Sequence, residues 1–154
     1  MTDNFQPWCP RVAVASIVES ENRFLLVEET IFGELVINQP AGHLEYGESL
    51  VAAAQRETLE ETGWEINVTG LVGIYRFNPP QSPGITYHRF CFVGEAVNHI
   101  GHQRLDDEIE QVLWLTHADI IQRKSSLRSP LVLRCIEDYQ KGYRYPLELI
   151  VEPA

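Results

Sequence analysis

The chain has 154 residues, of which 44% are hydrophobic and 22% charged, a composition typical of one folded domain over residues 1–154. Its formal net charge is −10, and such a surface repels phosphate backbones and anionic lipids. We therefore expect neither unaided nucleic-acid binding nor membrane binding. Three widely spaced cysteines suit a reducing compartment, and the first residues do not resemble a signal peptide, so we predict a cytoplasmic protein.

The first half of the chain predicts paired strands followed by a helix. Residues 12–18 and 24–27 are apolar runs rich in β-branched residues, and the polar residues between them predict a hairpin turn. Residues 49–62 contain helix-forming residues and neither glycine nor proline. Ser49 suits the N-cap of this helix, and Gly63 suits the left-handed residue that ends one.

The second half predicts more strands and two further helices. Residues 64–77 and 85–97 are apolar segments on either side of a proline-rich loop, and a shorter segment covers 111–115. Thr116 and Ser129 each suit the N-cap of a helix, and the proline after Ser129 suits a first helical position. Strands with a helix between them and helices late in the chain predict an α+β fold, an α/β/α sandwich.

The expected helix at 49–62 is the most informative segment, because it places glutamates on the face that should point inward. At about 100° per residue, Leu50, Ala54, Glu57 and Glu61 fall within roughly 60° of one another. Glu57 and Glu61 are like charges at positions i and i+4, and partial burial adds the cost of desolvating them. A divalent cation reverses this balance, since Mg²⁺ or Mn²⁺ prefers carboxylate oxygens, backbone carbonyls, waters and phosphate oxygens.

Helix geometry alone leaves two interpretations of this face open. In the first it is a phosphate-handling metal site, in which Glu60 binds the metal through water, or holds or deprotonates the attacking water. Arg56 then pairs with Glu48 or orients a neighbouring glutamate. In the second it is a solvated acidic helix surface.

The spacing of residues around this helix resembles the Nudix box of the Nudix hydrolases. Seven glycine or polar positions and one apolar position stand at the required spacing: Gly42, Glu48, Arg56, Glu57, Glu60, Glu61, Gly63 and Trp64. The one departure is Thr58, where the motif usually has an apolar residue. We expect this departure to affect packing against the sheet and not metal binding.

The resemblance implies both a fold and a reaction. The fold is a mixed sheet between helices, with the box as a loop–helix–loop. The reaction is attack of water on phosphorus in a nucleoside diphosphate linked to another group, with Mg²⁺ or Mn²⁺ bound. By match to the motif, the metal-binding acids are Glu57, Glu60 and Glu61, and the Gly42 carbonyl is a further metal ligand. Arg56 and Glu48 are supporting catalytic residues.

Segments outside the box, at 38–45 and 127–148, resemble the NudJ-type phosphatases of bacteria. That subgroup implies release of inorganic phosphate from nucleoside di- and triphosphates. It also implies action on thiamine diphosphate and its pyrimidine pyrophosphate precursor, by a monomer. Two alternatives stay open: hydrolysis of ADP-ribose or a sugar nucleotide, and a non-catalytic Nudix domain that senses a nucleotide.

Several residues outside the helix are further site candidates. Family members often supply an extra acid from a loop after the box. Glu108 and Glu110 are the best-placed candidates here, and Glu110 is the candidate metal ligand. The alternative for each is an ordinary solvated loop residue. Arg89 on its strand faces either substrate or solvent. His43 either contacts a phosphate or caps its loop. Arg128 precedes the start of a helix, whose free N–H groups either bind a phosphate or are capped in the ordinary way. Four aromatic residues could stack on a ring, although most strand aromatics are core: Trp8, Tyr75, Phe77 and Tyr87.

Overall fold

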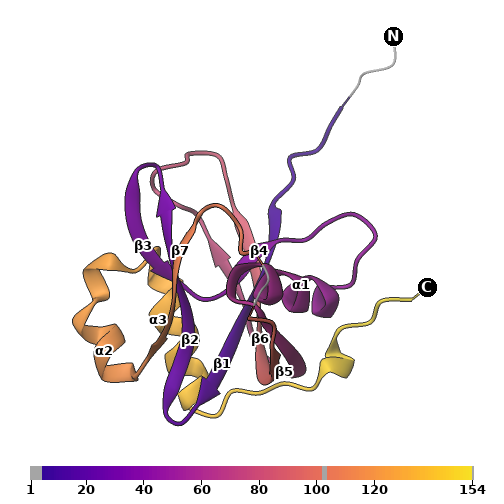
Figure 1. The fold of residues 1–154 in the computed structure, drawn as a ribbon. Coiled ribbons are helices and arrows are strands. Elements are labelled where there is room, and N and C mark those ends of the chain that lie inside the picture. Colours follow the sequence, from indigo (N-terminus) through magenta and orange to yellow (C-terminus); the bar gives the residue numbers. More distant parts are fainter. Residues whose placement is uncertain (1–4, 102–103, 154) are drawn as a thin grey trace.

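In the computed structural model, which describes residues 5–101 and 104–153, a mixed sheet lies between helices (Figure 1). The strands are β1 (Arg11–Ser20), β2 (Arg23–Ile31), β3 (Glu34–Asn38), β4 (Ala41–His43), β5 (Trp64–Phe77), β6 (Tyr87–His99) and β7 (Ile109–Leu115). The helices are α1 (Leu50–Thr62), α2 (His117–Gln122) and α3 (Pro130–Gln140), with short 3₁₀ turns η1 (Lys124–Ser126) and η2 (Leu147–Leu149).

The strands pair in the order β3-β2-β1-β6-β5, while β4 pairs with β1 and β7 pairs with β2. The β1–β6 pair is parallel, and the other pairs are antiparallel. A parallel pair needs a long crossover, and the chain between β1 and β6 supplies it with α1 included. The predicted α+β sandwich with a mixed sheet is therefore confirmed.

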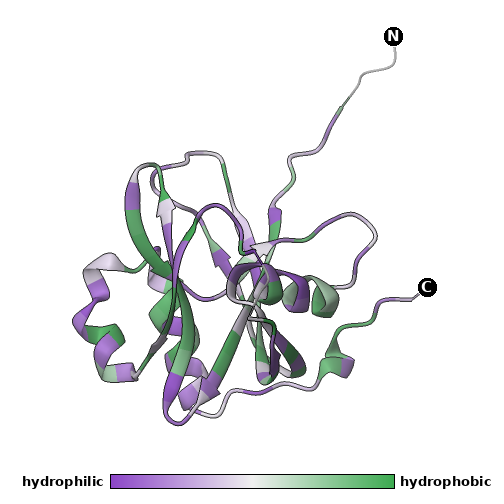
Figure 2. Ribbon diagram, viewed as in Figure 1, coloured by the Kyte–Doolittle hydropathy of each residue, from purple (hydrophilic) through white to green (hydrophobic). Residues whose placement is uncertain are grey.

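Two apolar layers, one on each face of the sheet, hold the helices in place. Val14 and Val18 of β1 belong to the layer that also contains Ala53 and Ala54 of α1. Ile17 of β1 belongs to the opposite layer, together with residues of α3. This division follows from the two-residue period of a strand, which sends alternate side chains to opposite faces. Figure 2 shows the hydrophobic residues concentrated along the strands and on the inner sides of the helices.

The helix and hairpin boundaries follow local rules closely. Ser49 is the N-cap of α1, since its side chain accepts a hydrogen bond from the Ala52 N–H at 3.0 Å. Gly63 ends the helix in the left-handed conformation, with φ 75°. The expected hairpin is present as well, because Ser20 of β1 pairs directly with Arg23 of β2.

Several strand boundaries differ from those expected, since β1 and β2 are longer than 12–18 and 24–27 and two later strands begin at other positions. The strand expected at 85–97 begins at Tyr87 and continues to His99, because β5 pairs with it along this whole length, from Phe77 opposite Tyr87 to Trp64 opposite His99. The strand expected to begin at position 111 begins at Ile109, and pairing with β2 extends it. Pairing with a neighbouring strand thus overrides the polar local sequence at both places.

Candidate metal centre

The β4 strand and helix α1 meet where Gly42 lies against Glu57. A Cβ atom at Gly42 would overlap the Glu57 carboxyl group, so only glycine allows this approach. Gly42 opposes Val14 of the central strand β1, and α1 packs against the same region of the sheet. The glycine of the motif therefore brings the backbone of the loop next to the first acidic side chain of the helix.

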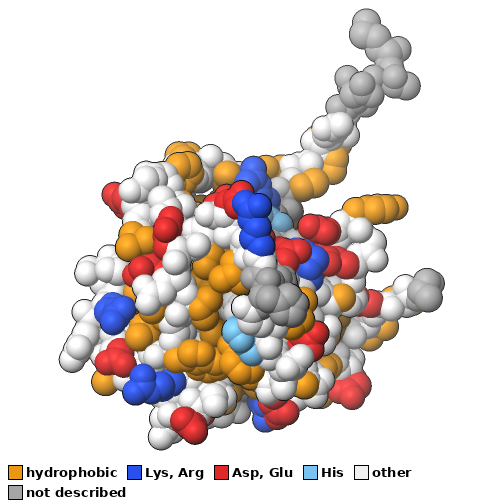
Figure 3. Space-filling model, in the orientation of Figure 1, with side chains coloured by type: hydrophobic (Ala, Val, Ile, Leu, Met, Phe, Trp, Pro, Cys, Tyr) orange, Lys and Arg blue, Asp and Glu red, His pale blue; other side chains and the backbone are white. Residues whose placement is uncertain are grey.

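Three carboxylates converge beside this contact. Glu57 and Glu60 of α1 and Asp106 of the loop before β7 each place one carboxylate oxygen within 4.8 Å of the others. The loop is tied to the helix by a backbone hydrogen bond, because the Asp106 N–H donates to the Glu60 carbonyl at 3.1 Å. Figure 3 shows acidic side chains gathered over the region of α1. Such a set of oxygen donors suits a hard divalent cation such as Mg²⁺ or Mn²⁺.

The pKa values of these acids are shifted in the direction that a bound cation would offset. Burial raises the pKa of Glu57, and hydrogen bonding to Arg56 opposes that rise. Burial and the neighbouring Glu108 raise the pKa of Asp106. In both cases the ionised form is disfavoured, and a bound cation would restore it.

Glu61 lies deeper than the other acids, with 6% of its surface exposed. One carboxyl oxygen accepts a hydrogen bond from the Ala41 N–H at 2.7 Å. Burial raises the pKa of Glu61 to about 9, and the charges of Glu29 and Glu57 add to the rise. The side chain is therefore protonated at neutral pH unless a cation stabilises the carboxylate.

Arg56 connects the acids of the box. Its guanidinium binds the Glu48 carboxylate through both Nε and Nη2, at 3.0 and 2.7 Å. Its Nη1 donates to Glu57 at 2.8 Å and to Glu60 at 3.2 Å, and Nη2 also donates to the His43 carbonyl at 3.1 Å. Hydrogen bonding to Arg56 lowers the pKa of Glu48. One cation thus fixes the loop and helix acids in a common geometry.

Thr58, the departure from the motif, is fully buried and satisfied. Its hydroxyl is within hydrogen-bond distance of the Ser16 hydroxyl, at 3.1 Å, and donates to the Ala54 carbonyl at 2.8 Å. Ser16 is a buried polar residue of β1. The two hydroxyls therefore satisfy one another at the contact between α1 and the sheet, where Thr58 packs.

The acid after the box that lies nearest to Glu57 and Glu60 is Asp106, which the sequence does not distinguish from its acidic neighbours. Glu110 lies on β7, where its carboxylate accepts a hydrogen bond from the Thr30 hydroxyl at 3.0 Å. Glu108 is exposed, and its carbonyl accepts a hydrogen bond from the Thr30 N–H at 3.1 Å. Neither belongs to the acidic cluster found among residues 5–101 and 104–153, in which Asp106 joins Glu57 and Glu60.

The predicted substrate residues lie on one face of the sheet. His43 of β4 opposes Ala13 of β1, which in turn opposes Arg89 of β6, so the three side chains point the same way. Partial burial and the charges of Arg11 and Arg128 lower the pKa of His43. His43 is therefore neutral at pH 7 and lies among cations, in a chain whose net charge is negative.

Arg89 does not face solvent, which corrects one of its two interpretations. Only 8% of the residue is exposed, and its Nη2 donates to the side-chain oxygens of Gln39 and Asn38. Its Nε is buried and has no hydrogen-bond partner among the described residues. Arg89 is therefore a buried cation held by two side-chain amides.

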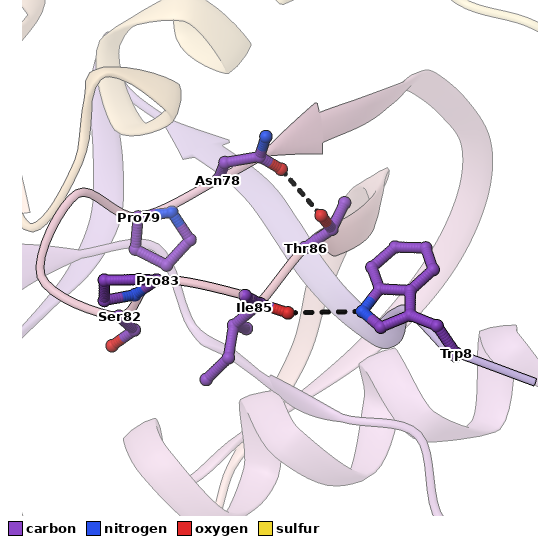
Figure 4. A pocket seen from close by; sticks show the side chains of 8 residues that line it. Trp8, Asn78, Pro79, Ser82, Pro83, Ile85 and Thr86 are labelled. Atoms are coloured by element: carbon purple, nitrogen blue, oxygen red, sulfur yellow. Dashed lines mark hydrogen bonds between the residues drawn. The ribbon is translucent and has the colours of Figure 1, made fainter. Parts of the chain in front are cut away.

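The aromatic candidates divide between the core and the edge of the sheet. Tyr75 donates to Asp138 of α3 at 2.8 Å and packs in the core. Trp8 lines a shallow hollow of about 230 Å³ beside the loop before β6, where its Nε1 donates to the Gly84 carbonyl (Figure 4). Tyr87 comes directly after Thr86, which lines this hollow, and the centroids of the Tyr87 and His43 rings are 5.8 Å apart.

Comparison with known proteins agrees with this geometry. The family model described as the NUDIX domain matches residues 9–135. A protein named Phosphatase NudJ from Escherichia coli K12 is 43% identical over 141 residues, which cover 92% of this chain and 90% of that protein. A solved NUDIX hydrolase from Nitrosomonas europaea is 42% identical, with a TM-score of 0.91, and the match covers 94% of this chain and 98% of that one.

A more distant structure shares the fold alone. An ADP-ribose pyrophosphatase from Streptococcus suis is 14% identical, with a TM-score of 0.66 over 89% of this chain and 96% of that one. The chain belongs to the Nudix family, and it is a Nudix hydrolase of the α+β sandwich class. Among its described residues no helix has the length and apolar character needed to cross a membrane.

Proposed function

We propose that this Nudix hydrolase is a phosphatase that releases inorganic phosphate from nucleoside di- and triphosphates with the help of Mg²⁺ or Mn²⁺. The observation that carries the proposal is the convergence of Glu57, Glu60 and Asp106 within 4.8 Å beside Gly42. The likeness to the protein named Phosphatase NudJ supports phosphate release over other outcomes. Enzymes of this family act on small phosphate-containing molecules and use divalent ions.

The residues of the box provide the catalytic roles in this proposal. Glu57 and Glu60, with Asp106, hold the metal, and the Gly42 carbonyl and Glu61 complete its protein ligands. A metal ion held by these residues would lower the pKa of a bound water and offset phosphate charge. Glu60 also orients the attacking water, because its carboxylate is the more accessible of the two on the helix, at 39% against 13% for Glu57.

Supporting residues hold the acids and receive the substrate. Arg56 fixes Glu48 and the helix acids through the hydrogen bonds described above. Arg89 and Arg128 provide positive charge for the part of the substrate that is not cleaved, and neutral His43 lies on the same face of the sheet as Arg89. Each arginine can bind phosphate oxygens through more than one N–H group.

A narrower proposal concerns the substrate and the state of the protein. We include thiamine diphosphate and its pyrimidine pyrophosphate precursor as substrates, because the residues around 38–45 and 127–148 resemble the NudJ-type phosphatases. We also propose a single-domain monomer in the cytoplasm, for which the buried free thiols of Cys91 and Cys135 suit a reducing compartment.

A substrate panel tests the proposal directly. The purified protein is incubated with GTP, GDP, thiamine diphosphate, ADP-ribose and a sugar nucleotide, with Mg²⁺ or Mn²⁺, and the products are separated. Inorganic phosphate from GTP and GDP supports the proposal. Pyrophosphate as the main product from GTP, or cleavage of ADP-ribose alone, would assign the enzyme to a different Nudix activity. Nucleotide binding without turnover would indicate a sensing domain.

A further inference from the structure

A buried carboxylate that lies outside the Nudix box contacts the proposed substrate residues. Glu29 of β2 is 3% exposed, and Arg128, just before α3, donates a hydrogen bond to it at 2.7 Å. The two residues are 99 positions apart in the sequence. An ionised carboxylate buried to this degree needs a partner of opposite charge, so this ion pair determines where the Arg128 side chain lies.

The same carboxylate reaches Arg89 through one intermediate residue. Asn38 donates to Glu29 at 3.5 Å with its amide nitrogen, and its amide oxygen accepts a hydrogen bond from Arg89 at 3.4 Å. The Asn38 amide is therefore oriented at one end by an anion and at the other by a cation. We call Glu29, Asn38, Arg89 and Arg128 the Glu29 network.

A neighbouring amide holds the other side of Arg89. Gln39 accepts a hydrogen bond from the Arg89 guanidinium and donates to the Val132 carbonyl of α3 at 2.6 Å. Arg89 is thus fixed by two amide oxygens, while its buried Nε stays without a partner among the described residues. By contrast, 43% of the Arg128 side chain is exposed, so its free N–H groups can reach a ligand while one of them holds Glu29.

We propose that Glu29 is a positioning residue for substrate binding, which holds Arg128 directly and Arg89 through Asn38. The inference rests on the proposed function, since it assigns these two arginines to the anionic part of the substrate. Glu29 itself does not touch the substrate, because its carboxylate is occupied by the network. Its negative charge orients the Arg128 cation directly and the Arg89 cation through Asn38, so that neither needs to rearrange when an anionic ligand binds.

The variant Glu29→Gln tests this role with little change of volume. The amide retains an oxygen for Asn38 but loses the charge that holds Arg128. Glu29 bonds to Arg128 and Asn38 and affects the metal-binding acid Glu61 through its charge, so we expect the KM for GTP to rise roughly tenfold while kcat stays within about threefold of the wild type. The adjacent, half-buried Glu28 serves as the matched control, and Glu28→Gln should leave both constants unchanged.

A double-mutant cycle separates positioning from a structural role. If Glu29 acts through Arg128, then Glu29→Gln should raise KM by much less in an Arg128→Ala background than in the wild type. Calorimetric binding of inorganic pyrophosphate in the presence of Mg²⁺ provides a readout that needs no turnover, with affinity lowered roughly tenfold in Glu29→Gln. Heat unfolding of each variant verifies that the folded fraction is the same at the assay temperature.

The outcomes distinguish this inference from the function on which it rests. A wild type that neither hydrolyses GTP nor binds pyrophosphate would overturn the proposed function and the positioning role together. A wild type active in both assays, with KM and pyrophosphate affinity unchanged in Glu29→Gln, would overturn the positioning role alone. Independent, multiplicative effects of Glu29→Gln and Arg128→Ala would likewise overturn it.

Discussion

Glu61→Gln should abolish metal-dependent turnover and at the same time stabilise the metal-free protein. The change keeps the volume of the side chain and the oxygen that accepts the Ala41 N–H hydrogen bond. It removes the carboxylate that the buried position disfavours. Loss of a charged ligand from the metal centre should lower kcat by about 100-fold or more.

The gain in stability can be worked out from the pKa of Glu61. In the folded protein this pKa is raised from 4.5 to about 9, so the folded state binds more protons than the unfolded chain between these values. The free energy of unfolding therefore decreases as the pH rises through that window. At pH 7 the decrease reaches roughly 3 kcal/mol, at about 1.4 kcal/mol per pH unit. Glutamine does not ionise, so we expect a gain of roughly 1–3 kcal/mol at pH 7.

Heat unfolding followed by circular dichroism, in EDTA, measures this gain. For a domain of this size the variant should unfold about 2–10 °C above the wild type at pH 7. The difference should be larger at pH 8 than at pH 5, because pH 5 lies only about half a unit above the ordinary pKa of 4.5 and little of the linked free energy has yet been lost. Exposed Glu65→Gln is the matched control and should show no such gain. A variant no more stable than the wild type at pH 8, or one that keeps its turnover with Mg²⁺, would refute the reasoning.

Two further predictions concern the geometry of the metal centre. Gly42→Ala should reduce turnover, measured as phosphate release, at least roughly 100-fold, because the added Cβ displaces the Glu57 carboxyl group. The control variant Gly101→Ala should remain active, since its added Cβ would meet only ordinary contacts. Asp106→Asn should weaken Mg²⁺ binding by about tenfold or more, measured by calorimetry, whereas Asp107→Asn on the exposed Arg104 ion pair should bind Mg²⁺ normally. Full activity of the first variant or unchanged Mg²⁺ affinity of the second would contradict these assignments.

Local sequence features predicted the helix of the centre with its ends. Ser49 and Gly63 act within a few residues of themselves, through a side-chain cap and a left-handed conformation that glycine adopts readily. The inward face of the helix also follows from its period alone, which predicts that Glu61 is buried, and the structure shows that it is. The family and the sandwich fold could be predicted because the motif is dense and its spacing specific.

Residues that depend on distant partners were predicted less well. Glu108 and Glu110 can be chosen from the sequence as candidates, but the position of each acid of this loop relative to α1 depends on the backbone hydrogen bond between Asp106 and Glu60 and on the pairing of β7 with β2. Arg89 looked equally suited to solvent, because nothing beside it in the sequence reveals that Asn38 and Gln39, 51 and 50 positions away, bind its guanidinium.

The amino-acid sequence by itself determined the Nudix helix, its caps, its acidic face and the type of metal chemistry that this face can support. Only the tertiary structure decided that Asp106 joins the acids and that Glu29 holds Arg128. The physical reason is the range of the interactions. Helix period and capping act over about four residues, whereas a buried ion pair or a metal cluster needs strands and loops that meet only after the sheet has formed.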